Sequence, residues 1–112
     1  MSKALLVGTP NSGKTALFNR LTGLNQRVAN YPGITVDISV GRMKGVEDWD
    51  LVDFPGTYSL RSISDEERVA VAHFETSLAD TEVGHVMCVV DATRLEKSLF
   101  FCLQVIRECR RH

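Results

Sequence analysis

The chain has 112 residues, the size of one domain and too short for two ordinary ones. Charged residues make up 24% of it and hydrophobic residues 44%, a globular balance that excludes disordered and fibrous classes. Thirteen basic and fourteen acidic side chains give a net charge of -1, so nucleic acid is not an expected partner. No apolar run is long enough to span a bilayer, and the odd number of cysteines, three, indicates reduced thiols. We therefore expect a soluble cytoplasmic domain.

The first half of the chain combines strand and helix patterns. In chain order, it predicts a buried strand over 3–7 and a helix over 14–22 that opens out of a glycine-rich loop. The polar stretch 24–33 contains a Pro-Gly pair and predicts a mobile loop. A half-exposed strand over 35–43 then pairs through a short turn with a strand over 49–54, so these two strands should run antiparallel.

The second half continues the alternation that is typical of an α/β sheet covered by helices on both faces. Ser64 is a good N-cap with Glu67 three residues later, which predicts a helix from there to Leu78. The apolar run over 85–90 predicts a strand buried on both faces. A final helix is predicted over 95–111. Its expected core-facing stripe is Leu95, Leu99, Cys102, Leu103 and Ile106.

A phosphate-binding pattern, G-x-x-x-x-G-K-[ST], is matched at every fixed position by residues 8–15. They are Gly8, Thr9, Pro10, Asn11, Ser12, Gly13, Lys14 and Thr15. The glycines let successive N–H groups converge on a phosphate, Lys14 can bridge the β- and γ-phosphates, and the Thr15 hydroxyl can bind Mg²⁺. A chance turn does not explain the match, because the loop follows a predicted strand and opens a predicted helix. We therefore predict a nucleotide site.

A second motif, Asp53-Phe54-Pro55-Gly56, follows another predicted strand. In isolation an Asp before a Pro-Gly turn is an ordinary way to end a strand. About forty residues after a phosphate loop, it is typical of a nucleotide switch, in which Asp53 reaches Mg²⁺ through a water and the Gly56 N–H meets the γ-phosphate. Thr35, between the loop and the next strand, is the natural second Mg²⁺ ligand.

Four segments together resemble the cytosolic G domain of ferrous iron transport protein B. They are 7–22 around Asn-Ser-Gly-Lys-Thr, 30–36 (Asn-Tyr-Pro-Gly-Ile-Thr-Val), 53–60 (Asp-Phe-Pro-Gly-Thr-Tyr-Ser-Leu) and 89–96 (Val-Val-Asp-Ala-Thr-Arg-Leu-Glu). The resemblance implies a P-loop, Ras-like fold that binds and hydrolyses GTP. It also implies that the complete protein carries this domain on the cytosolic face of the cell membrane, where it regulates a membrane domain that moves Fe²⁺.

The resemblance also assigns site residues. It implies switch I at about 24–36 and switch II at about 55–65. The nucleotide-binding set is residues 8–15 with Gly33, Ile34, Thr35, Val36, Asp37, Asp53, Phe54, Pro55 and Gly56. Catalytic roles fall to Lys14, Thr35 and Gly56, Mg²⁺ ligation to Thr15, Thr35 and Asp53, and K⁺ ligation to Asn11.

Two positions depart from related patterns. Thr9 replaces the asparagine common in the family and is expected to contribute only its backbone. Thr57 stands where Ras-like GTPases carry the water-positioning glutamine, so a glutamine-type mechanism is not expected. K⁺ held by Asn11 would then neutralise the charge that an arginine finger neutralises elsewhere.

The family's Asn-x-x-Asp motif is not present in residues 1–112, so we expect a partial G domain whose guanine preference rests on resemblance alone. Two alternatives stay open: a nucleotide-binding or assembly module without turnover, and a fragment of a P-loop ATPase or kinase. With the family's connectivity the sheet order is 2-3-1-4, strand 2 being antiparallel. The strand at 85–90 then forms an open edge, which predicts self-association through it.

Overall fold

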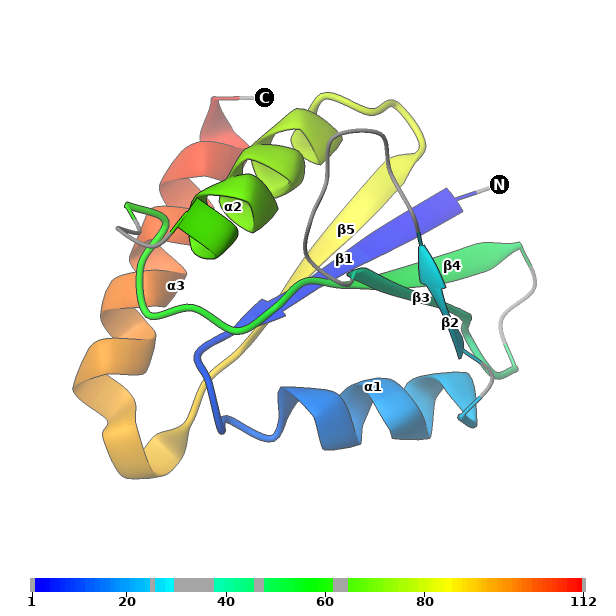
Figure 1. The fold of residues 1–112 in the computed structure, drawn as a ribbon, viewed down its shortest axis with the longest axis horizontal. Helices are drawn as coiled ribbons and strands as arrows, with labels where there is room; N and C mark the ends of the chain where they lie inside the picture. The colour runs from blue at the N-terminus through cyan, green and yellow to red at the C-terminus, as the bar shows by residue number, and fades with distance from the viewer. Residues whose placement is uncertain (1, 25, 30–37, 46–47, 62–64, 112) are drawn as a thin grey trace.

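The computed structural model describes residues 2–24, 26–29, 38–45, 48–61 and 65–111 (Figure 1). The elements, in chain order, are β1 (Ser2–Gly8), α1 (Lys14–Thr22), β2 (Gln26–Ala29), β3 (Ile38–Arg42), β4 (Trp49–Asp53), α2 (Asp65–Leu78), β5 (Val83–Val89), a 3₁₀ turn (Ala92–Arg94) and α3 (Leu95–Arg110). The helices predicted over 14–22 and up to Leu78 are confirmed; the Ser64 cap lies outside the described residues.

The five strands form one sheet in the order β2-β3-β4-β1-β5. β1 lies parallel to both β4 and β5, while β3 is antiparallel to β4 and to β2. The predicted order of four strands is therefore confirmed. The predicted loop over 24–33 is wrong at Gln26–Ala29, which pairs with β3 as an edge strand. Four residues are too few for an alternating pattern to show in the sequence.

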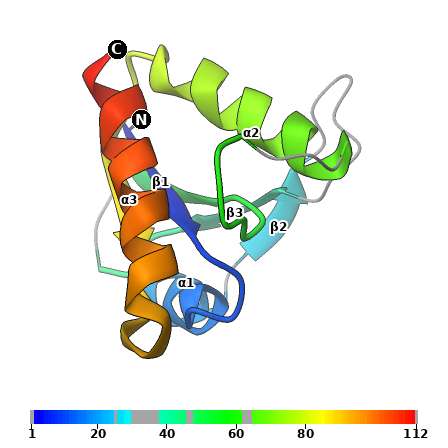
Figure 2. The same ribbon diagram turned by 90° about the vertical axis from the view of Figure 1, so that its left-hand side faces the viewer.

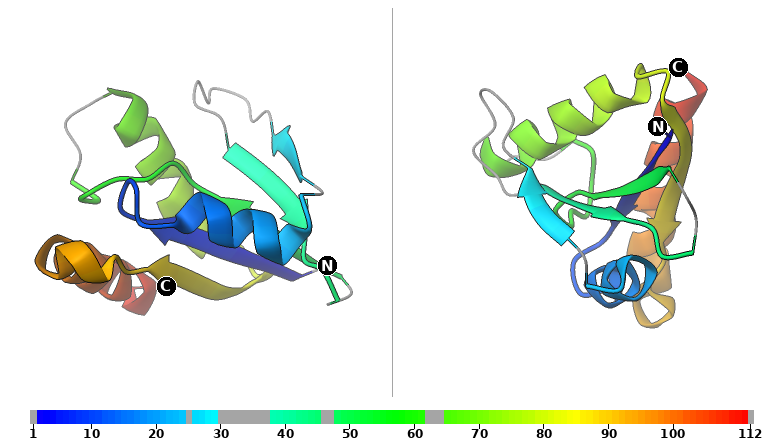
Figure 3. Two further views of the ribbon diagram at one scale, coloured as in Figure 1. Left: turned by 90° about the horizontal axis from the view of Figure 1, so that it is seen from below. Right: turned by 90° about the vertical axis from the view of Figure 1, so that its right-hand side faces the viewer.

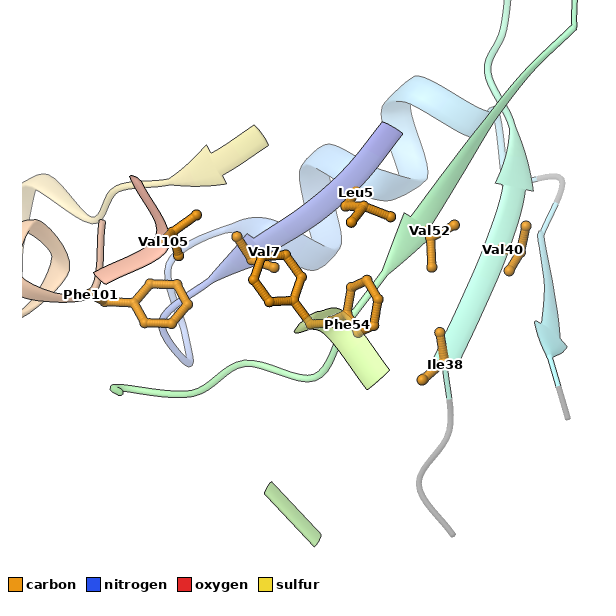
Figure 4. Close-up of a cluster of buried hydrophobic side chains, with 9 residues drawn as sticks. Leu5, Val7, Ile38, Val40, Val52, Phe54, Phe101 and Val105 are labelled. Carbon is orange, nitrogen blue, oxygen red and sulfur yellow. The ribbon is translucent and has the colours of Figure 1, made fainter. Parts of the chain in front are cut away.

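The helices cover the two faces of the sheet unequally. α1 lies against one face, and α2 and α3 lie against the other (Figures 2 and 3). Successive side chains of β1 point to opposite faces of the sheet, so β1 contributes to the core on both. Leu6 packs with Phe18 of α1. Leu5 and Val7 belong with Phe101 of α3 to the larger core cluster on the other face (Figure 4). Because both faces of β1 are buried, its end, where the phosphate loop begins, is held on a rigid support.

The orientation of α3 corrects the sequence prediction. Its buried side chains are Ser98, Phe101 and Val105. Most of the stripe expected to face the core is exposed, and Cys102 is only half-buried; the exposed members are Leu95, Leu99, Leu103 and Ile106. Apolar residues lie almost all around this helix, so periodicity admits more than one stripe. Packing against the sheet selects the one that carries Phe101.

β5 also differs from its prediction as a strand buried on both faces. Within the described sheet it is an edge strand paired with β1, and its side chains are half-buried or, at Gly84 and His85, exposed. A continuous apolar run is compatible with an interior strand, but its neighbours decide whether it is covered. Among the described helices, none combines the length and apolar character needed to cross a membrane.

Candidate functional site

The phosphate loop lies where its mechanism requires, between the end of β1 at Gly8 and the first residue of α1, Lys14. Asn11 and Gly13 adopt left-handed backbone conformations, with φ of 60° and 90°. Such turns direct successive N–H groups towards one region of space. Gly13 caps α1 without a side-chain hydrogen bond, so the first N–H groups of the helix are available to an anion.

A cleft of about 400 Å³ opens over this loop. Its walls include Thr9 to Thr15, Asp53, Pro55 and Gly56 from the predicted site, and Ala16 and Ser39 in addition. The structure thus brings both sequence motifs to one place. The side chain of Phe54 lies apart from them in the core, with its ring 5.5 Å from that of Phe74. Residues 33–37, including Thr35, lie outside the described residues.

Lys14 and Asp53 form an ion pair in this cleft, in which Lys14 Nζ donates a hydrogen bond to Asp53 Oδ1. Lys14 is only 7% exposed, which is unusual for a lysine unless it has a partner. Burial raises the pKa of Asp53, and the hydrogen bond and charge of Lys14 oppose that rise. The Lys14–Asp53 contact lies at low exposure, where electrostatic interactions are strong.

The oxygen donors of the cleft fit a hard cation. The Asp53 carboxylate and the exposed Thr15 residue line the same space, and Mg²⁺ prefers carboxylate, hydroxyl, water and phosphate oxygens. Ser12 also lines the cleft, and its Oγ is buried without a hydrogen-bond partner within the described part of the chain. Such a hydroxyl is stabilised when a ligand supplies its partner. The residues present therefore fit a phosphate ligand with its magnesium ion.

The segment after β4 is anchored on two sides. The Thr57 N–H donates to the Gly8 carbonyl at 3.2 Å. The Thr57 hydroxyl is nearly buried and lies 2.9 Å from the Ser59 carbonyl oxygen and 3.1 Å from Glu67 Oε2 of α2. Thr57 thus connects this segment to the end of β1 and to α2, and its side chain is engaged within the segment.

Sequence reasoning missed one part of the site. Thr9 was expected to contribute only backbone, but its side chain is 2% exposed and its Oγ1 lies 3.3 Å from Ser98 Oγ of α3. The backbone role expected of Thr9 stays a prediction, and the structure adds a side-chain partner 89 residues away in the sequence. One signal was available: Ser98 lies three and seven residues before Phe101 and Val105, so it is a polar residue on a helix face that turns out to be buried.

Known proteins resemble the chain over nearly its whole length. The sequence model of ferrous iron transport protein B matches residues 2–111. The Fe(2+) transporter FeoB of Legionella pneumophila is 42% identical over 110 residues, which are 94% of this chain and 14% of that protein.

Solved structures agree with that match. The G domain of the T. maritima FeoB iron transporter superposes with a TM-score of 0.78 at 39% identity, covering 96% of this chain and 66% of that one. NFeoB from S. thermophilus, bound to GDP.AlF4- and K⁺, has a TM-score of 0.74 at 44% identity, covering 95% of this chain and 40% of that one. With a P-loop fold, a matched family model and these relatives, the chain belongs to the ferrous iron transport protein B family.

Proposed function

We propose that the chain binds guanine nucleotide in the cleft over the phosphate loop and hydrolyses GTP to GDP and phosphate. The observation that carries this proposal is the buried Lys14–Asp53 pair at the N-terminus of α1, beneath left-handed turns at Asn11 and Gly13. An anion in that cleft meets backbone N–H groups, a helix dipole and one lysine at once. The GDP-containing structure of the S. thermophilus relative supports guanine over adenine.

The charge of each cleft residue sets its proposed role: the lysine binds phosphate, and the oxygen-bearing side chains bind cations. Lys14 would bind the β- and γ-phosphate oxygens, and the Asp53 carboxylate would hold the magnesium ion together with the hydroxyls of Thr15 and, from outside the described residues, Thr35. Gly56 offers its N–H to the γ-phosphate. Bound Mg²⁺ offsets the negative charge that develops on the phosphate oxygens. Asn11 supplies an amide oxygen to K⁺, a cation present in the structure of the S. thermophilus relative.

The wider role is regulation of iron transport. The chain spans 14% of the length of the L. pneumophila Fe(2+) transporter that it matches. We infer that residues 1–112 are part of a G domain that acts on a membrane domain moving Fe²⁺, from the cytosolic face of the cell membrane. Nucleotide state is the signal that such a domain passes on, because the segment following β4 lines the cleft with Pro55 and Gly56 and contacts β1 and α2 through Thr57.

Self-association is proposed through β5 and the neighbouring face of α3. β5 pairs with β1 on one side only within the described sheet. The next helix in the chain, α3, carries exposed apolar side chains; they are Leu95, Leu99, Phe100, Leu103 and Ile106. Unpaired strand edges and contiguous apolar surface both favour contact with another chain. A second copy of this chain can cover both features by pairing edge to edge.

Nucleotide identity is the direct test of the main proposal. Mass spectrometry of the nucleotide that co-purifies with the chain, followed by calorimetric titration with GDP and ADP in Mg²⁺, separates the alternatives. We expect GDP to bind more tightly than ADP, and we expect removal of Mg²⁺ to weaken GDP binding. Preference for ADP identifies a P-loop ATPase or kinase, and GDP binding without GTP turnover identifies a binding module.

The potassium role is tested by GTP hydrolysis in K⁺ and in Na⁺ at equal ionic strength. We expect faster hydrolysis in K⁺, and we expect Asn11→Ala to remove the difference without unfolding the chain, since Asn11 is exposed. Equal rates in the two salts contradict a role for Asn11 as a K⁺ ligand.

Self-association is tested by light scattering over the micromolar range. Leu103→Glu should shift the chain towards monomer, whereas Leu24→Glu, at an equally exposed leucine by the end of α1, should not. Protection of β5 amides from exchange should increase with protein concentration. A monomer at all concentrations, with freely exchanging β5 amides, contradicts the proposal.

A further inference from the structure

A buried hydroxyl pair connects the phosphate loop to the start of α3. Ser98 is 1% exposed and Thr9 2% exposed, and their hydroxyl oxygens lie 3.3 Å apart. The backbone N–H of Asp91, just after β5, donates to the same Ser98 oxygen at 3.1 Å. Through the one side chain of Ser98, α3 is therefore connected to two other segments, the phosphate loop and the end of β5.

The hydrogen bonds around Ser98 are complementary. The Asp91 N–H uses one acceptor site of the Ser98 oxygen. The remaining bond needs one proton, which either hydroxyl supplies and the other accepts. Since both side chains are buried, neither has ready access to water. Without the Ser98 hydroxyl, the Thr9 hydroxyl and the Asp91 N–H both lose their partner, and without the Thr9 hydroxyl, Ser98 keeps only its bond to Asp91. An unsatisfied buried group is costlier than a hydrogen bond is stabilising, so the pair strongly prefers this geometry.

The opposite side of the same loop segment is also held. A Cβ added to Gly56 would lie 3.0 Å from both the nitrogen and the Cα of Pro10, so the two backbones are already in close contact. The Thr57 N–H donates to the Gly8 carbonyl on this side. Residues 8–10 thus lie between α3 and the segment that follows β4, while Asn11 and Gly13 remain exposed to the cleft.

We propose that Ser98 is a positioning residue for the phosphate loop and, through it, for the nucleotide. It touches no reacting group; it acts through Thr9, which it holds so that residues 11–13 arch over the cleft with their N–H groups converging. This inference rests on the proposed nucleotide function, and it adds α3, a helix distant in sequence, to the parts that shape the site. A site held in advance binds more tightly because less ordering is needed on binding.

The test uses matched variants of the hydroxyl pair and measures GDP affinity in Mg²⁺ by calorimetry. Thr9→Val keeps the side-chain shape and removes the hydroxyl, whereas Thr9→Ser keeps the hydroxyl. We expect Thr9→Val and Ser98→Ala each to weaken GDP binding about tenfold, and Thr9→Ser by less than about twofold. The double variant Thr9→Val/Ser98→Ala should bind about as weakly as Ser98→Ala alone, because Ser98→Ala already removes the bond to Thr9 together with the acceptor of the Asp91 N–H.

A control distinguishes positioning from a general loss of stability. Thr22 is 3% exposed and its hydroxyl donates to the Phe18 carbonyl at the far end of α1. Thr22→Val should lower the free energy of unfolding much as Thr9→Val does, yet keep wild-type GDP affinity. Wild-type affinity in Thr9→Val, or equal loss in Thr22→Val, overturns the proposal, as does full additivity in the double variant. If Ser98→Ala does not fold, the GDP affinities of Thr9→Val and Thr9→Ser still test whether the hydroxyl pair positions the loop.

A second measurement separates this proposal from the proposed function. Amide resonances of residues 8–15 are recorded without nucleotide in the same variants. Thr9→Val should move those of residues 11–13, and Thr9→Ser and Thr22→Val should leave them in place. If the wild-type chain binds no GDP, the nucleotide function fails while this readout still tests the positioning. Unmoved loop resonances in Thr9→Val overturn it.

Discussion

The phosphate-loop end of the sheet and the β5–α3 flank, meaning β5 with the outward face of α3, handle polarity in opposite ways. At the loop end, Lys14, Thr9 and Ser98 are buried although they are polar. Along the flank, Phe100 is 57% exposed and Leu103 65% exposed although they are apolar. The loop end therefore concentrates buried polar groups with partners, and the flank concentrates exposed apolar ones.

The difference teaches that polarity alone does not decide burial here. Lys14, Thr9 and Ser98 can be buried because each has a partner from another element: Asp53 for Lys14, and Thr9 and Ser98 for one another. The exposed apolar residues of the flank lie on α3, outside the face that carries its buried residues Phe101 and Val105. Function that needs a rigid, preorganised site belongs at the first region, and association belongs at the second.

The largest expected effect is a loss of stability, and it distinguishes two neighbouring phenylalanines of α3, one on the outward face and one facing the core. Phe101→Ala should lower the free energy of unfolding by about 3–5 kcal/mol, because Phe101 is 1% exposed and fills the core between α3 and the sheet. Phe100→Ala should change it by less than about 0.5 kcal/mol. Urea unfolding of both variants measures the difference, and Phe101→Leu replaces Phe101→Ala if the latter does not fold. Similar losses at the two positions contradict the orientation of α3.

The next effect belongs to the loop end. Lys14→Ala should weaken GDP binding about a hundredfold, because it removes the buried cation that we propose binds two phosphates and leaves Asp53 without its partner. Calorimetry on a folded variant measures the loss. Lys44→Ala is the control, since Lys44 is exposed at the opposite end of α1. Wild-type affinity in Lys14→Ala contradicts the phosphate-loop interpretation.

A glycine in each region allows a sharper comparison. Gly56→Ala places a methyl group 3.0 Å from the Pro10 backbone, which must move, so GDP affinity should decrease about tenfold. Gly84→Ala on β5 meets the Trp49 ring instead, with its nearest atom at 2.8 Å. That variant should be less stable but bind GDP normally. Equal affinity losses contradict the separation of the two regions.

The smallest effect concerns the interior of the flank. Burial, together with the neighbouring Cys102 thiol, raises the pKa of Cys88 from 9.0 to about 12. Between those pH values the unfolded chain loses a proton that the folded chain keeps, so the free energy of unfolding should decrease as pH rises. Cys88→Val should weaken this dependence. Urea unfolding below and above pH 9 measures it, and identical slopes in both proteins show that Cys88 is solvated in the folded chain.

Much of the site could be predicted because its chemistry is local. Residues 8–15 carry the glycines, the lysine and the threonine of a phosphate loop within eight consecutive positions, and the strand before and the helix after them follow from short-range patterns. Asp53 was predictable for the same reason, as a carboxylate at the end of a strand. Joining it to Lys14 needed only that β1 and β4 run parallel, which places their ends at one edge.

The tertiary structure alone decided the remaining features. Whether α3 presents Leu103 or Phe101 to the core depends on its rotation against the sheet, and its sequence is apolar on several sides. Pairing of Gln26–Ala29 with β3 depends on backbone hydrogen bonds, which form with nearly any side chain at these positions. The Thr9–Ser98 pair joins residues 89 positions apart. The sequence by itself determined what lies within one turn or strand, because local backbone preferences act there, whereas contacts between distant elements depend on how the completed layers pack.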